Sequence, residues 1–597
     1  LALAERKNQL TRRSEREDDE PGKEHRVLAR DDPVTVIVRP DIEDRSFHAK
    51  TKAFTGPETA FPNAVATREN GFQFQPGDNT LTVTSSAGSY VDEPEWQYMI
   101  EHPVDRERGF DDCSDLFSPG YFRHRLLAGE SLVLTGTASA ARNASAATAE
   151  LANWTAPPAE SAAQRDAERV LGDIEHAARR AVRDFVVRRE NEYTVIAGYP
   201  WFLDWGRDTF IALRGIIAMG WHDTAFRILR TFARFEKDGT LPNMIHGENA
   251  ANRDTSDAPL WFFVACRELL AASDNQQDIL SADCAGRPLK EVLVSIAKNY
   301  CAGTPNGIHA DPESGLIYSP PHFTWMDTQH PAGTPRAGYP VDIQALWSAA
   351  LKLLGDLPLP DREQWQKRRA EVDDAIRRFY VREDGAGLVD CLHAASGTDH
   401  AADCEPDDHC RPNQLLAVTL GDALSSNDAG NVVRACMPLL VPGAIRSLAN
   451  RNVLYALPVY NSEGTLLNDP TRPYQGHYTG DEDTQRKPAY HNGTAWTWLF
   501  PTFCEALVKV HGQAAVDTAR AYLASTARPF NNGCAGHLPE ILDGDAPHVQ
   551  RGCDAQAWSV TEVARVARLL SELKAQQHET AAKTVTEEKT SENPANP

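Results

Sequence analysis

The sequence of 597 residues lacks several features that would place it in other classes of protein. It has no run of about 18 apolar residues, so we expect no membrane-spanning helix. Cationic residues are too few to balance the acidic ones: 61 Lys and Arg face 84 Asp and Glu, for a net charge of −23. This charge argues against nucleic acid or an anionic membrane as partner. A neutral ligand such as a carbohydrate is compatible with it.

The eleven cysteines lack the spacing of a disulfide framework. An odd number fits reduced thiols in the cytoplasm better than paired disulfides. The opening residues also lack the apolar segment of a signal peptide. We therefore expect a cytoplasmic protein, and we interpret the glycosylation patterns at Asn143 and Asn153 as chance matches.

One polar stretch contains residue types that bind metals, namely Cys404, Asp407, Asp408, His409 and Cys410. Its spacing matches no standard zinc pattern. We interpret it as an ordinary loop, with a metal site as the alternative.

The chain changes character along its length. Residues 1–32 are charged and unpatterned, which predicts a disordered or truncated end. Residues 33–140 contain short strand-like segments separated by turn residues, as in an antiparallel β-sandwich. These segments are 34–38, 79–84, 95–100 and 131–135. Residues 141–162, rich in Ala, Ser and Pro, predict a linker.

Residues 163–574 show helical periodicity. About twelve amphipathic stretches alternate with long loops rich in Gly, Pro, Trp and Asp. After a first helix near 170–185, they lie near 207–219, 222–236, 257–273, 287–302, 341–354, 361–380, 412–424, 428–441, 493–511, 513–527 and 556–574. Twelve helices in sequential pairs predict a mainly α fold, an (α/α)6 toroid, or barrel. A repeat solenoid is disfavoured because no fixed period occurs. Residues 575–597 predict a disordered tail.

The most unusual stretch is residues 196–210, where three aromatic residues alternate with charged ones just before a helix. Trp205 precedes Arg207 and Asp208, and Asp204 precedes all three. Aromatic faces cover the C–H surface of a sugar, and a fixed Arg–Asp pair grips its hydroxyl groups. A structural ion pair beneath a packed loop is the alternative. Later loops repeat the same combination of Trp, acid and amide residues, which favours a sugar site.

Several motifs follow one another along the chain in an order that is specific to one family. They are Gly198–Ile211 (GYPWFLDWGRDTFI), Leu241–Asn243, Asp257–Phe262, Thr324–Asp327, Thr334–Arg336, Arg411–Gln414, Tyr490–Thr494 and Gln556–Ser559. The region from about 165 to 572 resembles the glucosidase domain of glycogen-debranching enzymes, which are similar to glucoamylases. Residues 33–140 resemble the accessory β domain of prokaryotic-type members, notably at Glu107–Asp111 and Leu116–Gly120.

This resemblance implies an amylo-α-1,6-glucosidase that needs no cofactor and acts on glycogen or a branched maltodextrin. Only about 160 residues precede the helical region, too few for the (β/α)8 barrel that carries transferase activity in two-activity debranching enzymes. We therefore expect the glucosidase alone. A glucoamylase-like hydrolase of α-1,4 glucans is the alternative enzyme, and a non-catalytic glucan-binding protein is the alternative of another class.

Inverting glycosidases use a protonated carboxyl and a carboxylate roughly 6.5–9.5 Å apart. The family motif places the acid at Asp327, where the apolar neighbours Trp325 and Met326 favour the protonated form. We predict Glu540 as the base, with Asp543, Asp545 and Asp554 as nearby rivals.

The resemblance also suggests which residues hold the sugar. Arg207 and Asp208 would bind hydroxyl groups of the terminal glucose, between Trp205 and Trp325 as ring platforms. Further predicted contacts are Asp204, Asp257, Arg336, Asp342, Gln344, His491, Trp496 and Trp558. For Asp204 and Asp257 a helix cap is an equal alternative.

Two departures from the family pattern limit this transfer of residue roles. Asp342 stands where the family usually has Glu, which is one methylene longer, so a sugar contact there would need rearrangement. The segment 455–489 matches the family only loosely. We expect substrate preference to be least predictable there.

Overall fold

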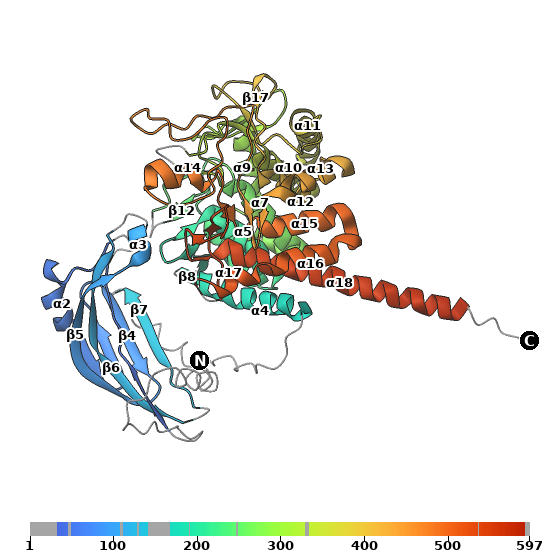
Figure 1. Cartoon of the computed structure of the whole chain (residues 1–597). Coiled ribbons are helices and arrows are strands. Elements are labelled where there is room, and N and C mark those ends of the chain that lie inside the picture. The colour runs from blue at the N-terminus through green and yellow to red at the C-terminus, as the bar shows by residue number, and fades with distance from the viewer. Residues whose placement is uncertain are drawn as a thin grey trace, which may run out of the picture. The chain divides into compact units, whose positions relative to one another are not determined.

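The computed structural model describes residues 33–45, 49–107, 111–127, 130–140, 167–189, 192–245, 249–328, 333–534 and 536–591. The chain divides into two compact units, residues 1–162 and 163–597 (Figure 1). The predicted disordered end at 1–32 and the predicted linker at 141–162 lie outside the described residues.

The first unit contains two antiparallel sheets, one ordered β1-β6-β5 and the other β2-β3-β4-β7. The strands are β1 (Val34–Val38), β2 (Val65–Arg68), β3 (Gly71–Phe74), β4 (Asn79–Ser85), β5 (Ser89–Glu101), β6 (Cys113–Leu126) and β7 (Leu134–Ala140), with helices α2 (Pro57–Asn63) and α3 (Pro103–Glu107). Aromatic residues of both sheets share one core: the rings of Phe72 in β3 and Phe122 in β6 lie 6.3 Å apart.

The strand prediction was right for β1 and nearly right for β4. It found only part of β5, began three residues too early at β7, and missed β2, β3 and β6. In β6 the sequence Leu-Phe-Ser-Pro-Gly reads as a turn, yet it continues as a strand because β5 pairs along it with two irregularities.

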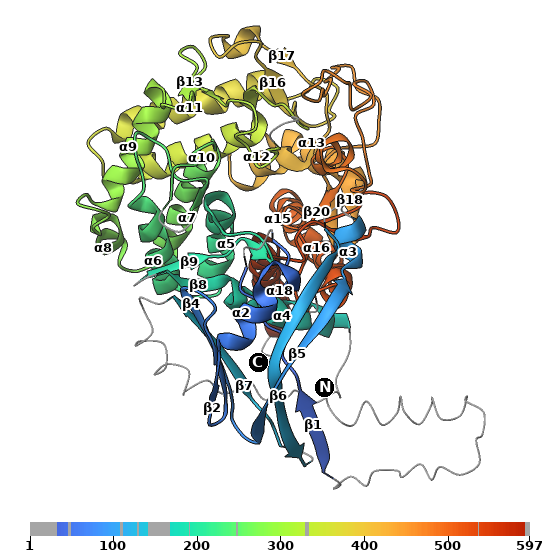
Figure 2. The same ribbon diagram turned by 90° about the vertical axis from the view of Figure 1, so that its left-hand side faces the viewer.

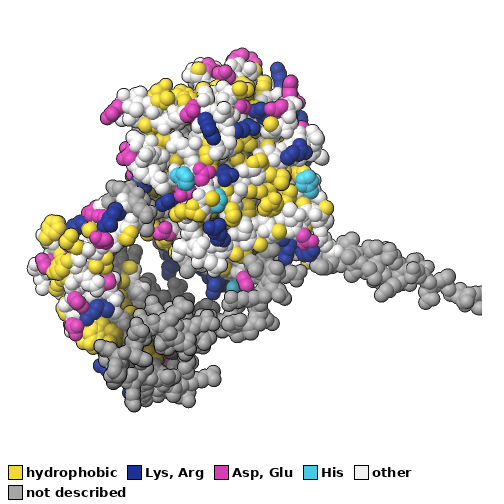
Figure 3. Space-filling view, viewed as in Figure 1, with side chains coloured by type: hydrophobic (Ala, Val, Ile, Leu, Met, Phe, Trp, Pro, Cys, Tyr) yellow, Lys and Arg dark blue, Asp and Glu magenta, His cyan; other side chains and the backbone are white. Residues whose placement is uncertain are grey.

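The second unit is built mainly of helices. These are α4 (Ala167–Phe185), α5 (Gly206–Ala218), α6 (His222–Ala233), α7 (Ala258–Ala271), α8 (Gln276–Ser281), α9 (Leu289–Ala302), α10 (Val341–Asp356), α11 (Arg362–Tyr380), α12 (Leu415–Thr419), α13 (Ser426–Cys436), α14 (Lys487–Tyr490), α15 (Phe500–His511), α16 (Val516–Ala524), α17 (Ala527–Asn531) and α18 (Ala557–Ser591). Charged residues of both signs are interspersed over the face shown in Figure 3.

Six of these helices contact one another in a closed series: α5 with α7, then α10, α12, α15, α18 and back to α5. The helices α4, α6, α9, α11, α13 and α16 pack on the outside of this series (Figure 2). An outer helix returns the chain to its starting end between successive inner helices. All six inner helices therefore begin at the same end of the unit. The loops before the inner helices therefore gather there.

Short strands connect the loops at that end. They are β8 (Val186–Arg189), β9 (Glu192–Val195), β10 (Gly198–Tyr199), β11 (Asp204–Trp205), β12 (Met244–Ile245), β13 (His309–Ala310), β14 (Ile317–Tyr318), β15 (Gly338–Pro340), β16 (Cys391–His393), β17 (Glu405–Pro406), β18 (Leu440–Val441), β19 (Ala444–Arg446), β20 (Ala495–Trp496), β21 (Ile541–Leu542), β22 (Gln550–Arg551) and β23 (Ala555–Gln556). The five strands β18 to β22 form one antiparallel sheet in chain order.

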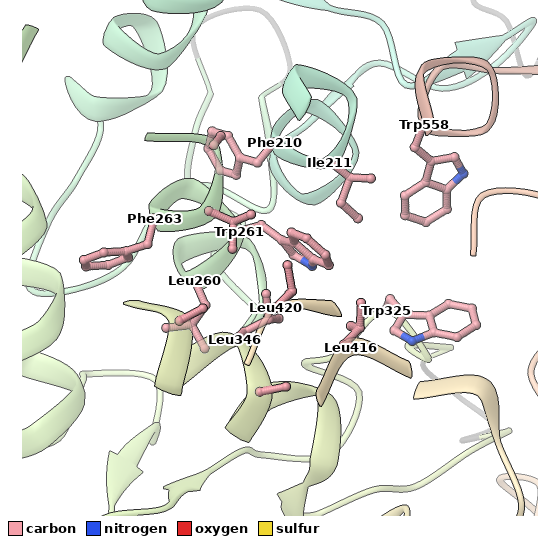
Figure 4. Close-up of a cluster of buried hydrophobic side chains, with 14 of the residues drawn as sticks. Phe210, Ile211, Leu260, Trp261, Phe263, Trp325, Leu346, Leu416, Leu420 and Trp558 are labelled. Carbon is pink, nitrogen blue, oxygen red and sulfur yellow. The ribbon is translucent and has the colours of Figure 1, made fainter. Parts of the chain in front are cut away.

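One large apolar core fills the space between the inner helices. Phe210 of α5, Trp261 of α7 and Leu346 of α10 are each at most 1% exposed (Figure 4). Packing is closest between α5 and α18, where a Cβ added to Gly215 would lie 2.3 Å from the backbone oxygen of Thr561. The inner helices are apolar on most sides because they are surrounded by protein.

The last helix is longer than predicted. The sequence predicted its end at 574 and a disordered tail from 575, but α18 continues to Ser591. Ala, Glu, Lys and Gln dominate this extension and are strong helix formers, which explains the correction. Residues 592–597 lie outside the described part. Among the helices that the structure describes, none combines the length and apolar character needed to cross a bilayer.

Candidate active site

The loop at residues 196–210 lies where the inner helices begin. Its strand β10 pairs with β23, directly before α18, and β11 pairs with β12. The first pairing requires Gly198, because a Cβ there would lie 2.9 Å from the backbone oxygen of Ala555. These pairings bring Arg207 and Asp208, in the first turn of α5, to the start of α18.

Arg207 joins three separate loops. Its guanidinium donates to Asp257 at 2.7 Å, to Asp327 at 2.9 Å and to the backbone oxygen of Thr324 at 3.0 Å. Asp257 occupies the N-cap position of α7, but its side chain makes no cap hydrogen bond there. A charge-assisted contact of this kind fixes the direction of the guanidinium, so Asp257 positions Arg207.

Asp327 is the more accessible of the two carboxyl groups that Arg207 binds. Its side chain is 32% exposed, against 2% for Asp257. Removal of water by the surrounding protein raises the pKa of Asp327 above its usual value, although Arg207 opposes the rise. A raised pKa favours the protonated form that a general acid needs.

Asp208 is 6% exposed and accepts a hydrogen bond from the Gln556 amide at 3.0 Å. Burial raises the pKa of Asp208 to about 7 despite the charge of Arg207, and the charges of Glu540 and Asp327 raise it further. The charges of both predicted catalytic carboxyls thus act on Asp208.

Glu540 stands directly before β21 and is 3% exposed. One carboxylate oxygen accepts a hydrogen bond from the Tyr490 hydroxyl, and the other accepts the Cys553 backbone N–H at 2.9 Å. Gly552 permits this approach, since an added Cβ would lie 2.3 Å from that second oxygen. Two donors aimed at one acid suit the ionised form of a base.

Two of the nearby acids that rivalled Glu540 are engaged elsewhere. Asp543 pairs with Arg551 at 3.3 Å and accepts the backbone N–H of Tyr478. Asp545 accepts a hydrogen bond from the Tyr474 hydroxyl at 2.8 Å. Glu540, by contrast, acts through its charge on Asp208, the neighbour of Arg207.

The predicted aromatic residues differ in how accessible they are. Trp205 is partly exposed and packs its ring edge against Phe202. Trp325, Trp496 and Trp558 are at most 4% exposed. Trp325 crosses Trp496 at 5.0 Å, and both contact His491, which is fully buried. Burial lowers the pKa of His491 well below its usual value, so the ring is neutral. These four residues belong to one cluster of buried rings, and Figure 4 shows Trp325 and Trp558 at one side of the core.

Four predicted contacts lie inside the protein instead. Arg336 pairs with Asp342 at 2.7 Å and with Asp390 at 2.8 Å, and each of the three is at most 3% exposed. The Gln344 amide bonds the backbone of Ile317 in both directions. Asp204 accepts a bond from Arg189 at 2.8 Å.

In this structure, hydrogen bonds within the protein therefore use the groups of these four residues that were predicted to hold a sugar. The shorter side chain of Asp342 is explained at the same time. Its carboxylate accepts a hydrogen bond from Arg336 at 2.7 Å.

Two residues of the site were missed as functional residues. Tyr490 and Gln556 were noticed only as parts of motifs, and the structure shows them bonded to Glu540 and Asp208. Their positions directly before His491 and the final helix were the available signal.

The stretch from Cys404 to Cys410, for which a metal site was the alternative, holds two carboxylates that bond other parts of the protein. Asp408 accepts the backbone N–H groups of Leu454 and Tyr455, and Asp407 bonds His393 at 3.0 Å. No group of three or more His, Cys, Asp or Glu side chains within the described ranges is placed to hold a metal ion. All eleven cysteines are free thiols.

Comparison with known proteins gives two family matches. Residues 180–565 match the family described as amylo-alpha-1,6-glucosidase. Residues 22–133 match that described as glycogen debranching enzyme N terminal.

One curated relative is the glycogen debranching enzyme of Saccharomyces cerevisiae, 24% identical over 411 residues. The match covers 54% of this chain and 26% of the relative, so the chain spans about a quarter of that protein.

Two solved structures resemble the chain more distantly. A glycosidase variant in complex with glucose has a TM-score of 0.47 at 13% identity, covering 68% of this chain and 99% of that one. A rhamnosidase from Klebsiella oxytoca with rhamnose bound has a TM-score of 0.44 at 13% identity, covering 90% and 96%.

Proposed function

Because the chain belongs to the amylo-alpha-1,6-glucosidase family, we propose that this glycoside hydrolase removes α-1,6-linked glucosyl branches from glycogen or a related α-glucan, with inversion. The observation that carries the proposal is the convergence of Asp327 and Glu540, from loops far apart in sequence, on the Arg207–Asp208 pair. Single-displacement hydrolysis needs two carboxyl groups, one as acid and one as base, and this pair supports that mechanism.

In this mechanism Asp327 donates its proton to the glycosidic oxygen of the leaving chain. Glu540 accepts a proton from a water molecule that attacks the anomeric carbon from the opposite face. Tyr490 and the Cys553 N–H hold Glu540 in place for this step. One bond forms as the other breaks, so α-linked glucose leaves as the β anomer.

Asp208 is the alternative candidate for the general acid. Its pKa of about 7 would also suit a proton donor. Accessibility favours Asp327, whose side chain is 32% exposed while Asp208 is 6% exposed. Arg207 and Asp208 are better suited to hold hydroxyl groups of the terminal glucose, with Trp205 beside the ring.

For the fold we propose an (α/α)6 toroid in residues 163–574, preceded by a β-sandwich-like domain in residues 33–140. The closed series of contacts from α5 to α18 and back supports the first part. The two antiparallel sheets sharing one aromatic core support the second. Eleven free thiols support a reducing compartment such as the cytoplasm.

The test compares Asp327→Asn with Asp208→Asn and the unaltered protein. We expect Asp327→Asn to lower kcat on a glucosyl-branched α-1,6 dextrin by at least about 10³-fold while its Kd for the dextrin stays within a fewfold. Asp208→Asn should chiefly raise KM. A larger kcat loss in Asp208→Asn than in Asp327→Asn would reverse the two assignments.

The same assays decide between the remaining functions. Faster glucose release from a linear α-1,4 maltooligosaccharide than from the branched dextrin would favour a glucoamylase-like enzyme. Binding without release from either would favour a glucan-binding protein. Initial release of α-glucose, followed by NMR, would exclude inversion.

A further inference from the structure

The long excursion at residues 447–486, between β19 and α14, ends beside the catalytic groups. Its last part holds Tyr474 and Tyr478, which bond Asp545 and Asp543. It leads into α14, whose Tyr490 donates to Glu540. Its first part is anchored by Asp408. Both anchors leave the middle of the excursion to project from the end of the unit that carries the site (Figure 1, brown-orange loop to the left of β17).

The middle of the excursion is a small hairpin with well-defined geometry. Tyr460 and Leu466 face each other across an antiparallel bridge. Asn461 closes the turn by accepting the backbone N–H groups of Glu463 and Thr465 at 3.0 and 2.7 Å. Asn468 ties the base to Val459 at 2.9 Å and to Leu457 at 2.9 Å. The hairpin is therefore held in one shape by its own hydrogen bonds.

This hairpin presents apolar side chains to solvent. Directly paired residues project on the same face, and here both are exposed, Tyr460 at 53% and Leu466 at 45%. Leu454, at the start of the excursion, is 94% exposed. The hairpin thus holds a tyrosine ring and a leucine side chain side by side in water, where neither is buried in the core.

We propose that Tyr460 and Leu466 bind the leaving-side part of the α-glucan, the main chain from which the branch is removed. The proposal rests on the proposed function, because a pocket that takes one terminal glucose leaves every other sugar outside it. Sugars outside the pocket are the ones that an exposed hairpin can meet.

The chemistry of the hairpin fits a sugar better than a protein. A tyrosine ring covers the C–H face of a pyranose, and its hydroxyl bonds a sugar hydroxyl. A second copy of the chain would need about 1,000 Å² or more of complementary surface for a stable interface, which two side chains on one hairpin do not supply. The fixed hairpin also loses little entropy when a ligand binds.

The test uses Tyr460→Ala/Leu466→Ser in the full chain and two substrates. One is an α-1,6-glucosyl maltoheptaose, which has a long leaving chain, and the other is isomaltose, which leaves a single glucose. We expect the double variant to raise KM on the long substrate about tenfold with little change in kcat. On isomaltose kcat/KM should change by less than twofold.

The matched control is Tyr98→Ala, which removes a tyrosine of similar exposure, 54%, in the first unit. It should leave both substrates unchanged. Equal losses on both substrates, or no loss on either, would overturn the proposal, and so would a change in oligomeric state of the double variant.

A second measurement separates this proposal from the proposed function. Linear maltoheptaose is titrated calorimetrically into Asp327→Asn with and without the two hairpin substitutions. Weaker binding with the substitutions supports the hairpin site even if the unaltered protein hydrolyses neither substrate. Equal binding contradicts it.

Discussion

Tyr490 is the residue whose role can be tested most directly, because its hydroxyl donates to Glu540. Tyr490→Phe removes a donor from the carboxylate, which then binds a proton more readily. We expect the acidic limb of the kcat/KM pH profile to move to higher pH and the rate at the optimum to fall about tenfold, or ~1.4 kcal/mol.

Tyr474→Phe is the control, since the Tyr474 hydroxyl donates to Asp545 instead. It should leave the acidic limb in place. A loss of rate in Tyr490→Phe without any shift of the limb would show that Tyr490 does not act through Glu540.

Asp208 makes stability depend on pH. Its pKa is raised from 3.8 to about 7 in the folded chain, mainly by burial. The folded state therefore holds this proton more tightly than the unfolded one, and the stability that the proton contributes is complete below about pH 4 and declines as pH rises to 7.

We expect the unaltered protein to lose on the order of 2 kcal/mol of unfolding free energy relative to Asp208→Asn between pH 5 and pH 7.5. Urea unfolding of both proteins at the two pH values measures it. A constant difference between them would contradict the raised pKa.

For individual residues, the sequence predicted which side chains the family motifs contain. It did not predict which of these side chains bond one another. Arg207, Asp327 and Glu540 were expected in the site, whereas Arg336 and Gln344 proved to be internal. A motif gives residue types in order. Whether a polar side chain faces a ligand or another loop depends on contacts across more than a hundred residues, as between Arg207 and Asp327.

Among the elements, the contact of α5 with α18 is the one that tolerates least change. A Cβ at Gly215 would lie 2.3 Å from the Thr561 backbone oxygen. Gly215→Ala gains about 1 kcal/mol of helix propensity but forces the two backbones apart. We expect a net destabilisation of roughly 1–3 kcal/mol, measured as a lower urea midpoint.

Gly430→Ala is the matched control. It lies inside α13, where an added Cβ would meet only a Val510 methyl group at 3.9 Å. Propensity alone should raise stability by up to about 1 kcal/mol there. If the urea midpoints of both variants shifted in the same direction, close backbone packing would not explain why position 215 is a glycine.

Long periodic helices were predicted well, and short strands were not. α11 was expected at 361–380 and spans Arg362–Tyr380. The stretch at 493–511 was expected to be one helix, but α15 begins only at Phe500, because Trp496 pairs with Ile541 in a sheet of two- and three-residue strands. Two residues carry no periodicity, so a pairing of this kind cannot be seen in the sequence.

For the whole molecule, the two units have separate apolar cores. We expect calorimetry to resolve two unfolding transitions. Phe72→Ala, at a side chain with 0% exposure in the first unit, should lower only one of them, by about 3–5 kcal/mol of stability.

Glucose release after partial heating provides the check on which unit unfolds. Activity should survive the transition that Phe72→Ala lowers. A single transition that shifts as a whole would show that the two units unfold together.

The pairing of Gly198–Tyr199 with Ala555–Gln556 has a consequence for biosynthesis. The nascent chain presents Arg207 and Asp208 early, but the strand and helix that complete their surroundings emerge from the ribosome some 350 residues later. At about 5–20 residues per second, this leaves tens of seconds in which the apolar flank of α5 awaits α18. The enzyme should therefore acquire its activity only after α18 has emerged, and chaperones that bind exposed apolar helices have their opportunity during that interval.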